Sequence, residues 1–200
     1  MARQKSYDRE EAVIKATNAF REHGYQNLGI RAIEELVGIG RFAIRTDFDG
    51  KEGLFKEALA TYTKEYTELV IQPIREADDI SALEGFFERS ASEEYDARLN
   101  HGCLLVNTMI ETPTYQYPEF NAYTQPHFDS LKEAVFELVN KAKINGTVKE
   151  SVNATHAAEF INGAIISMNV MNRDANNIKG TEGYADMVLA TIASWKTNAK

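Results

Sequence analysis

Cysteine, long apolar runs and the usual targeting patterns are nearly or wholly missing from this sequence. Cys103 is the single cysteine among 200 residues, so an internal disulfide is excluded. No run of about 18 apolar residues occurs, so no membrane span is expected. The N-terminal segment MARQKSYDREEA lacks the apolar centre of a signal peptide. Together these absences predict a cytoplasmic protein with no membrane partner.

The patterns of most enzymes and metalloproteins are missing as well. His23, His101, His127 and His156 show no metal-ligand spacing. There is no glycine-rich nucleotide loop and no Ser-His-Asp arrangement. We therefore expect no cofactor, no metal and no enzymatic activity. One alternative stays open, an all-α enzyme that uses Cys103 with His101 or His127, because a histidine can activate a thiol.

Positive charge is scarce overall, but it is unevenly distributed. The chain has 22 Lys and Arg against 30 Asp and Glu, a formal charge of −8. Residues 1–56 contain ten basic and nine acidic residues, a net of +1, and the remainder contains twelve and twenty-one, a net of −9. This distribution argues against nucleic-acid binding over the whole surface. A local phosphate site is expected only at the N-terminal end.

What the sequence does contain is a helix-turn-helix pattern between Ile30 and Phe55. Apolar residues recur at the spacing of one helix face up to Val37. Gly38 can then adopt the left-handed conformation with which helices commonly end. A second short helix follows and carries Arg41 and Arg45 one turn apart. Two short helices across a glycine turn, the second of them basic, are typical of a DNA-binding unit.

The rest of the chain alternates helical patterns with breaks and shows no strand-like alternation. We therefore predict an all-α fold of about nine helices. Residues 1–50 are expected to form a three-helix helix-turn-helix domain, and residues 51–200 a helical ligand-binding and dimerisation domain. A long helix from Lys51 to about Gln72 joins the two. Residues 103–110, CLLVNTMI, are apolar nearly all round, which indicates a buried central helix.

The segment Ala12–Phe55 resembles the N-terminal domain of the TetR family of bacterial transcriptional repressors. The likeness is carried by AFREHGY at residues 19–25, Arg31-x-Ile33, the Gly38-Ile39 turn and DFDGKEGLF at residues 47–55. Residues 102–111, GCLLVNTMIE, are similar to a segment of the family's regulatory domains. The resemblance implies a double-stranded DNA operator, a small-molecule effector and a homodimer that pairs through its last two helices.

Seven residues are the predicted DNA contacts: Arg31, Gly40, Arg41, Phe42, Arg45, Thr46 and Lys51. One of the helix arginines can read a guanine edge while the other binds phosphate. Lys51 lies at a helix N-terminus, where backbone N–H groups attract phosphate. Arg31 either reaches phosphate or pairs with a neighbouring glutamate. Phe42 either contacts DNA, at a thymine methyl or a base step, or packs inward, and we favour packing.

Two further sets of residues belong to the predicted second domain. The effector pocket combines aromatic walls with a few polar groups: Phe86, Phe87, Tyr95, Cys103, Asn107, Tyr123 and His127. For any one of them ordinary core packing is the alternative, and for Cys103 we favour a buried, unreactive thiol over a redox or electrophile sensor. The dimer interface is predicted from the resemblance at Phe160, Ile161, Ala164, Ile165, Met168, Met187, Ile192 and Trp195.

These features together predict a homodimeric repressor that binds a palindromic operator and is released by a small apolar or aromatic effector. Some departures from the family pattern keep a second hypothesis open. Leu28 and Gly29 stand where family members usually have Thr or Ser, and Phe42 and Asp47 are also unusual at their positions. A same-fold ligand-binding or adapter protein with weakened or lost operator binding remains the alternative.

Overall fold

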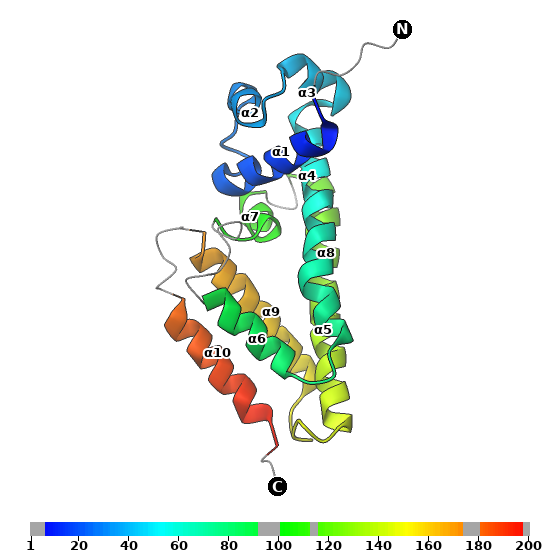
Figure 1. Ribbon diagram of the computed structural model, residues 1–200, viewed down its shortest axis with the longest axis vertical. Coiled ribbons are helices and arrows are strands. Elements are labelled where there is room, and N and C mark those ends of the chain that lie inside the picture. The colour runs from blue at the N-terminus through cyan, green and yellow to red at the C-terminus, as the bar shows by residue number, and fades with distance from the viewer. Residues whose placement is uncertain (1–6, 92–100, 113–115, 174–180, 198–200) are drawn as a thin grey trace. The chain divides into compact units, whose positions relative to one another are not determined.

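The computed structural model describes residues 7–91, 101–112, 116–173 and 181–197 of the chain (Figure 1). The helices among these residues are α1 (Arg9–His23), α2 (Ile30–Val37), α3 (Arg41–Asp47), α4 (Gly50–Tyr66), η1 (Thr67–Ile71), α5 (Gln72–Glu76), α6 (Ser81–Ala91), α7 (Leu104–Glu111), α8 (Pro118–Ile144), α9 (Ala154–Met171) and α10 (Glu182–Trp195). Because α4, η1 and α5 follow one another without a break, the described residues form nine helical segments. Their only extended pairing is an isolated bridge between Val148 and Lys196. The predicted all-α class is confirmed.

The first three helices form where the sequence pattern places them. The Asp8 side chain accepts a hydrogen bond from the backbone N–H of Glu11 at 2.8 Å and so caps α1. Gly38 ends α2 in the left-handed region, with φ 79°, and its N–H donates to the Glu34 carbonyl oxygen at 3.0 Å. Ile39 follows this turn and is buried. The helix-turn-helix frame is therefore set by local signals.

The long helix after residue 50 extends beyond its predicted end near Gln72. It passes through the π-helical turn η1 and continues as α5 to Glu76, although Pro73 lies within it. Proline has no N–H to donate to the carbonyl of the residue four positions earlier. A π-helical turn at that place changes the hydrogen-bond register, so the chain stays helical past the proline. The predicted helix end near Gln72 did not take this adjustment into account.

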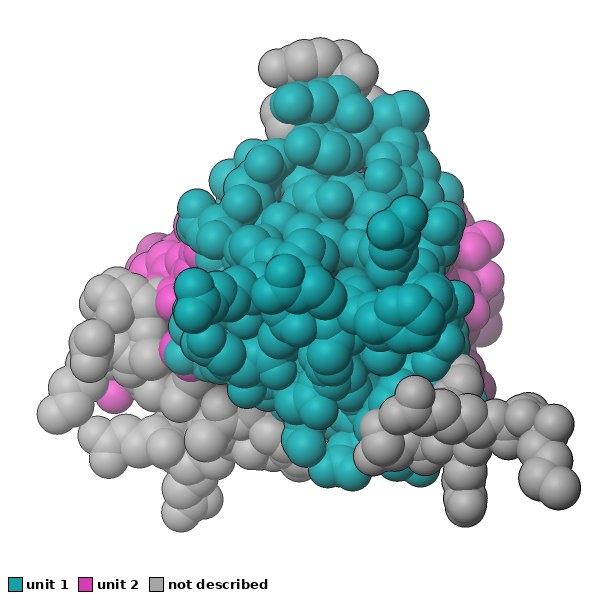
Figure 2. Space-filling view, turned by 90° about the horizontal axis from the view of Figure 1, so that it is seen from above, with its two compact units in different colours: residues 1–65, 104–124 teal, residues 66–103, 125–200 magenta. Residues whose placement is uncertain are grey.

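Residues 1–65 and 104–124 form one compact unit, called unit 1 here (Figure 2). Its centre is an aromatic cluster, defined as Phe20, Tyr25, Phe55, Tyr117 and Phe120. The Phe55 ring centroid lies 4.8 Å from that of Phe20, 4.5 Å from that of Tyr25 and 4.9 Å from that of Phe120. These rings come from α1 and the turn after it, from α4, and from the start of α8 with the residue before it. The cluster therefore joins segments that are far apart in sequence.

Within unit 1, α7 contacts the C-terminal end of α1. Asn107 donates a hydrogen bond from Nδ2 to the backbone oxygen of Arg21 at 3.2 Å. Glu111 accepts one at Oε2 from the backbone N–H of Tyr25 at 2.9 Å. Gly24 lies between them with φ 81°, and a Cβ there would lie 2.4 Å from the Glu111 Oε1. Glycine therefore permits both the turn and the close approach of the carboxylate.

Residues 66–103 and 125–200 form the second compact unit, unit 2 (Figure 2). In it α10 packs against α6 and α9 (Figure 1). Its core includes Leu83, Leu131, Val135, Ile161 and Ile192, all of them fully buried. None of the helices in the described parts of the chain has the length and apolar content that a membrane span requires.

Residues 103–106 of the CLLVNTMI segment are buried, as predicted. The polar side chains of Asn107 and Thr108, which follow them, are buried as well. The segment enters α7 at Leu104, and Cys103, Leu104 and Leu105 are all nearly inaccessible. Met109 and Ile110, the last two residues of the segment, are exposed. The burial of Cys103 agrees with the interpretation of an inaccessible thiol, because an apolar environment disfavours the thiolate.

Candidate nucleic-acid interface

The outward side of α3 holds four of the predicted DNA contacts. Successive residues of an α-helix are rotated by about 100°, which places four exposed residues on one continuous arc. In order around the helix they are Arg41, Arg45, Phe42 and Thr46. Ile44 lies on the other side and is buried. The arc therefore presents two guanidinium groups, an aromatic ring and a hydroxyl to solvent.

Glu34 of α2 holds both the start of α3 and one of these arginines. Its carboxylate accepts a hydrogen bond from the backbone N–H of Arg41 at 2.6 Å and lies 3.3 Å from the Arg41 Nε. Gly40 precedes α3 and has no side chain to cap it, so Glu34 supplies the acceptor. The Nε of Arg31 lies 3.9 Å from Glu35. Exposed ion pairs contribute little energy, so both arginines can exchange these partners for phosphate.

Phe42 points away from the core, with 76% of its surface exposed. The expectation that it packs inward is wrong. Phe42 and Ile44 are rotated by about 200° from each other on one helix, so they cannot both face α2. Ile44 occupies the inward position and is 1% exposed. A short helix with two apolar candidates leaves this choice to tertiary packing.

Asp47 connects the end of α3 to the start of α1. The Tyr7 hydroxyl donates to its Oδ2 at 2.6 Å, and Arg9 donates from Nη1 to its backbone oxygen at 2.8 Å. Burial and the Asp47 carboxylate raise the pKa of Tyr7 to about 12, so this hydroxyl remains a donor at neutral pH. Asp47 therefore has a structural role that the sequence pattern did not indicate. Arg45 makes no ion pair with any residue that the structure describes.

Lys51 lies in the first turn of α4, but its side chain covers an aromatic ring. Its Nζ is 4.3 Å from the centroid of the Tyr25 ring. Burial lowers the pKa of Lys51, because a low-dielectric environment disfavours the charged form. A phosphate contact requires the side chain to leave this cation–π position. The predicted Lys51 contact stays a prediction.

Comparison with known proteins identifies this arrangement of three helices. Residues 15–58 match the family described as "Bacterial regulatory proteins, tetR family". The chain belongs to the tetR family. It is 32% identical to the transcriptional repressor AcnR of Corynebacterium efficiens over 127 residues, which cover 64% of this chain and 61% of AcnR. It is 24% identical to the transcriptional repressor ComR of Escherichia coli, with 88% of this chain and 85% of ComR covered.

Solved structures of tetR-family regulators share the fold over nearly the whole chain. A TetR regulator from Chloroflexus aurantiacus has a TM-score of 0.80 at 21% identity and covers 94% of this chain and 95% of its own. A cysteine mutant of the regulator CifR, solved with 26-bp operator DNA, has a TM-score of 0.79 at 19% identity and covers 97% and 100%. The family consists of transcriptional regulators rather than enzymes, so this chain is a tetR-family transcriptional regulator.

The predicted effector-pocket residues fall into both units. Phe86, Phe87, Cys103 and His127 belong to unit 2, and Asn107 and Tyr123 to unit 1. Tyr95 lies outside the described residues. The Phe86 and Phe87 rings are 5.3 Å apart, whereas Asn107 contacts the end of α1. No shared site is assigned across the two units, and the pocket stays a prediction.

His127 is the most unusual polar group of the predicted pocket. It is 4% exposed, and its Nδ1 makes no hydrogen bond with the described residues. Its ring centroid lies 4.6 Å from that of Tyr66 in an edge-to-face arrangement. Burial lowers the pKa of His127 from 6.5 to about 4. At neutral pH the imidazole is therefore neutral and has a free polar atom in an apolar environment.

Replacement of His127 by Phe is expected to change how stability depends on pH. Between pH 6.5 and about 4 the unfolded chain binds a proton at His127 that the folded chain does not bind. The wild type therefore loses up to about 3 kcal/mol of stability from this group as pH falls through that window. In His127→Phe this loss is absent, so its stability relative to wild type improves on acidification. Urea unfolding at pH 7 and pH 4.5 measures the difference.

The exposed His156 provides the matched control for that measurement. His156→Phe removes a histidine from the surface of α9 and so controls for the loss of one histidine from the chain. A His127→Phe protein whose stability relative to wild type is the same at both pH values contradicts the assignment of a buried neutral imidazole.

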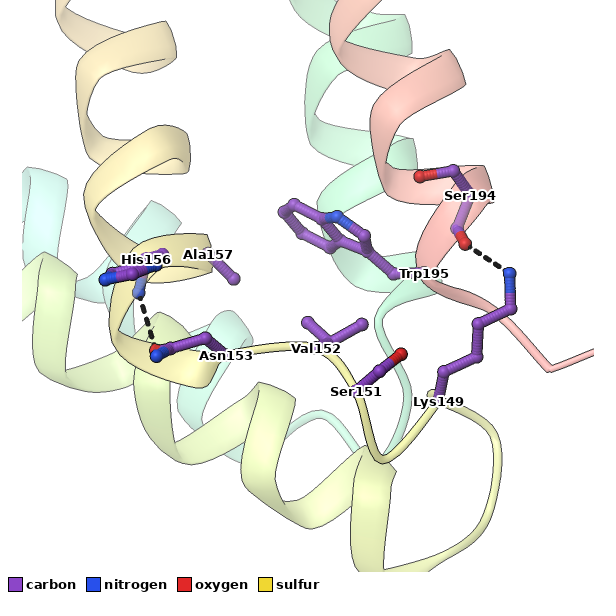
Figure 3. Close-up of a pocket in the computed structure, with 8 residues that line it drawn as sticks. All are labelled: Lys149, Ser151, Val152, Asn153, His156, Ala157, Ser194 and Trp195. Atoms are coloured by element: carbon purple, nitrogen blue, oxygen red, sulfur yellow. Dashed lines mark hydrogen bonds between the residues drawn. The ribbon is translucent and has the colours of Figure 1, made fainter.

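A surface hollow of about 490 Å³ lies beside the N-terminus of α9 (Figure 3). Its polar groups already stabilise the local structure. Lys149 donates from Nζ to the backbone oxygen of Ser194 at 2.7 Å, and Asn153 accepts at Oδ1 from the backbone N–H of His156 at 3.1 Å. These contacts account for the residue types, and we assign no ligand to this hollow.

Most of the predicted dimer-interface residues are buried within the chain itself. Those at most 2% exposed are Ile161, Ala164, Ile165, Met168 and Ile192. A side chain that is already buried in one chain offers no surface to a second, so these five belong to the core of unit 2. Met187 is 68% exposed, Phe160 is 39% exposed and Trp195 is half-buried. The helical periodicity of the sequence did not distinguish the buried side of α9 from its exposed side, because α9 is apolar almost all round.

Proposed function

We propose that this regulator is a cytoplasmic homodimer that represses transcription by binding a palindromic operator. The observation that carries the proposal is the exposed arc of α3 with its two arginines. An α-helix fits into the major groove of B-DNA, where arginine can bind guanine or phosphate. A two-fold dimer places two such helices on half-sites about 34–36 Å apart or a multiple of that distance. Residues 1–50 would form the DNA-binding domain and residues 51–200 the regulatory domain.

The charge distribution supports this orientation on DNA. The acidic remainder of the chain, with its net charge of −9, repels the phosphate backbone. The nearly neutral N-terminal segment then remains the favoured face for approach. CifR, which shares the fold, has been solved with double-stranded operator DNA, and ComR and AcnR are described as repressors. Repression by this chain is inferred from those likenesses.

A small apolar or aromatic effector would release the operator. Phe86, Phe87 and His127 are the aromatic and polar groups of unit 2 that such a molecule would contact. An effector releases DNA only if it binds more tightly to a conformer in which the two α3 helices do not fit their half-sites. Within unit 1, the contacts of Asn107 and Glu111 with the end of α1 give a physical means by which a movement of α7 would displace the DNA-binding helices.

The proposed dimer pairs through the exposed sides of α9 and α10. Both carry exposed apolar groups: Phe160, Val170 and Met187. Gly163 and Ala190 are small, exposed residues on the same helices. Large apolar groups beside small ones allow close approach of helices, and exposed apolar patches commonly mark interfaces. This interface differs from the one predicted from the sequence by excluding the five buried residues.

Met187→Asp is expected to dissociate the dimer. Burial of a carboxylate in an apolar interface is strongly unfavourable, so the dissociation constant should rise at least about tenfold. Sedimentation equilibrium over a concentration series measures this change. Ile144→Asp is the control, because Ile144 is 85% exposed at the end of α8 and lies outside the proposed interface. Equal dissociation constants for Met187→Asp and wild type contradict the interface.

A mobility-shift experiment tests the function itself. Duplex fragments from the region upstream of the protein's own gene are titrated with the protein at two salt concentrations. A sequence-specific shift that weakens with salt supports a DNA-binding regulator. The alternative, an adapter that has lost operator binding, is favoured by one observation, that Gly29 precedes α2 and no side chain caps this helix. If the protein gives no specific shift on any fragment, the repressor proposal fails and the alternative stands.

A further inference from the structure

Phe42 is a large apolar side chain placed on the most polar side of the helix-turn-helix. With 76% of its surface exposed, it costs solubility without contributing to the core. Arg41 precedes it, and Arg45 follows three residues later on the same arc. An aromatic ring next to two cations on one arc has a specific requirement. Its partner must carry negative charge beside a small apolar group.

The surface around Phe42 is continuous with other apolar atoms. An open hollow of about 570 Å³ is lined by Ile30, Arg41, Phe42, Ile44, Arg45 and Gly50. Ile30 is 37% exposed at the start of α2, so two apolar side chains from different helices face the same space. The hollow therefore offers an apolar contact area enclosed by guanidinium groups.

The major groove of DNA contains one apolar group, the 5-methyl of thymine. The other groups that distinguish the base pairs there are hydrogen-bond donors or acceptors, which a phenyl ring cannot satisfy. Phosphates on both sides of the groove provide the negative charge that the two arginines require. Insertion of the ring between base pairs is the competing use of an exposed Phe. Such wedges, however, enter from the minor groove, whereas a helix-turn-helix presents its second helix to the major groove.

We infer that Phe42 reads the 5-methyl group of a thymine in each half-site, next to the base or phosphate contacts of Arg41 and Arg45. This inference rests on the proposed DNA-binding function and adds a sequence requirement to it. The operator must contain a T·A pair at a fixed position in each half-site. Removal of that methyl group should weaken binding, and it should do so only while residue 42 carries a large apolar side chain.

The test uses duplexes selected by the full-length protein from random DNA of about 30 base pairs, long enough for two half-sites. Each thymine of the selected duplex is replaced in turn by deoxyuridine, which lacks only the methyl group. For the wild type, one position per half-site should lose roughly three- to tenfold in affinity, the order expected for one buried methyl-sized contact. With Phe42→Ala, the same deoxyuridine duplex should bind as well as the thymine duplex.

Two control variants make the result specific. Leu36→Ala removes another exposed apolar side chain, 45% exposed on α2, and should keep the thymine dependence of the wild type. Phe42→Leu keeps an apolar group at this position and should retain part of the thymine dependence. Thermal unfolding checks that Phe42→Ala is folded, which its exposure leads us to expect.

The outcomes separate this inference from the function on which it rests. The contact between Phe42 and a thymine methyl group is overturned if no thymine of the selected duplex is sensitive to deoxyuridine replacement. It is also overturned if wild type and Phe42→Ala show the same sensitivity. Both outcomes leave the DNA-binding proposal intact. Failure to select any duplex overturns the DNA-binding proposal and this inference with it. Sensitivity at one thymine per half-site that disappears in Phe42→Ala supports both.

Discussion

Replacement of Arg45 by alanine is expected to weaken operator binding by about ten- to a hundredfold for each half-site. Arg45 is exposed on α3 and forms no ion pair with the residues that the structure describes, so its charge is available to DNA. A hydrogen bond to a charged group contributes about 1.5–3 kcal/mol, and each 1.4 kcal/mol is a factor of ten in affinity. In a dimer the substitution removes this hydrogen bond from both half-sites. Fluorescence anisotropy with a labelled operator measures the change.

The salt dependence of binding shows which kind of interaction Arg45 makes. If the residue binds phosphate, affinity falls uniformly across DNA sequences. The slope of log K against log salt then decreases by about 0.9 for each phosphate that is no longer neutralised. If it reads a guanine, the decrease in affinity is largest on the operator and specificity relaxes at one base pair. The two possibilities are therefore distinguished by measuring one operator and one unrelated duplex at several salt concentrations.

Arg75→Ala is the control for the change in net charge. Arg75 lies on α5 in unit 2, where its Nη2 is 3.0 Å from the Ser130 hydroxyl and 3.5 Å from Glu133. Its removal alters the formal charge by the same amount, but in unit 2 instead of on α3, and should leave the affinity nearly unchanged. An Arg45→Ala protein that matches the wild type in affinity and salt slope shows that Arg45 does not face DNA.

Replacement of Phe55 by alanine is expected to destabilise the fold by about 3–5 kcal/mol, as for other buried phenylalanines. Phe55 is 1% exposed and lies within 5 Å, centroid to centroid, of Phe20, Tyr25 and Phe120. Its removal leaves a cavity at the centre of the aromatic cluster. For a chain of this size, each 1 kcal/mol lowers the melting temperature by about 2–4 °C, so a decrease of roughly 6–20 °C is expected.

Phe136→Ala is the matched control for this measurement. It removes the same side chain from α8, where Phe136 is 41% exposed, and should cost less than about 1 kcal/mol. Both variants are compared with the wild type at one protein concentration, because the stability of a dimer depends on concentration. Equal melting temperatures for Phe55→Ala and Phe136→Ala contradict the central role of the aromatic cluster.

Loss of Phe55 should also weaken operator binding, although Phe55 is buried away from α3. The cluster joins α1 and α4, and α1 packs against α2. A less rigid α1 lets α3 occupy orientations that do not fit the major groove, and only the competent fraction binds. A Phe55→Ala protein with undiminished operator affinity below its melting temperature shows that the cluster contributes stability alone.

The features predicted correctly from the sequence depend on interactions between near neighbours. The left-handed turn at Gly38 needs only a few consecutive residues, and so does the apolar spacing of α2. The buried segment after Cys103 was predicted because it is apolar on nearly all sides. Local signals of this kind are consistent with the fold as a whole, as expected for natural sequences.

The features that the sequence left undecided depend on what packs against each side of a helix. Phe42 and Ile44 are both apolar, and only the contact of α3 with α2 fixes which one is inside. Asp47 stood out in the sequence only as an unusual residue at its position, and its Tyr7 partner lies 40 residues earlier in the chain. No local pattern reports a contact over that separation. The same applies to Lys51, whose ring partner Tyr25 belongs to the turn after α1.

The sequence by itself determined an all-α chain with a helix-turn-helix between Ile30 and Phe55. The helical period and the glycine stop are encoded within each short stretch. Only the tertiary structure decided which residues of that motif face outward, because exposure depends on neighbours brought together by folding. It likewise decided which side of α9 is left uncovered, since Ile161 and Ile165 are buried in unit 2 while Phe160 remains exposed. The surfaces open to DNA and to a second chain are therefore properties of the packed structure.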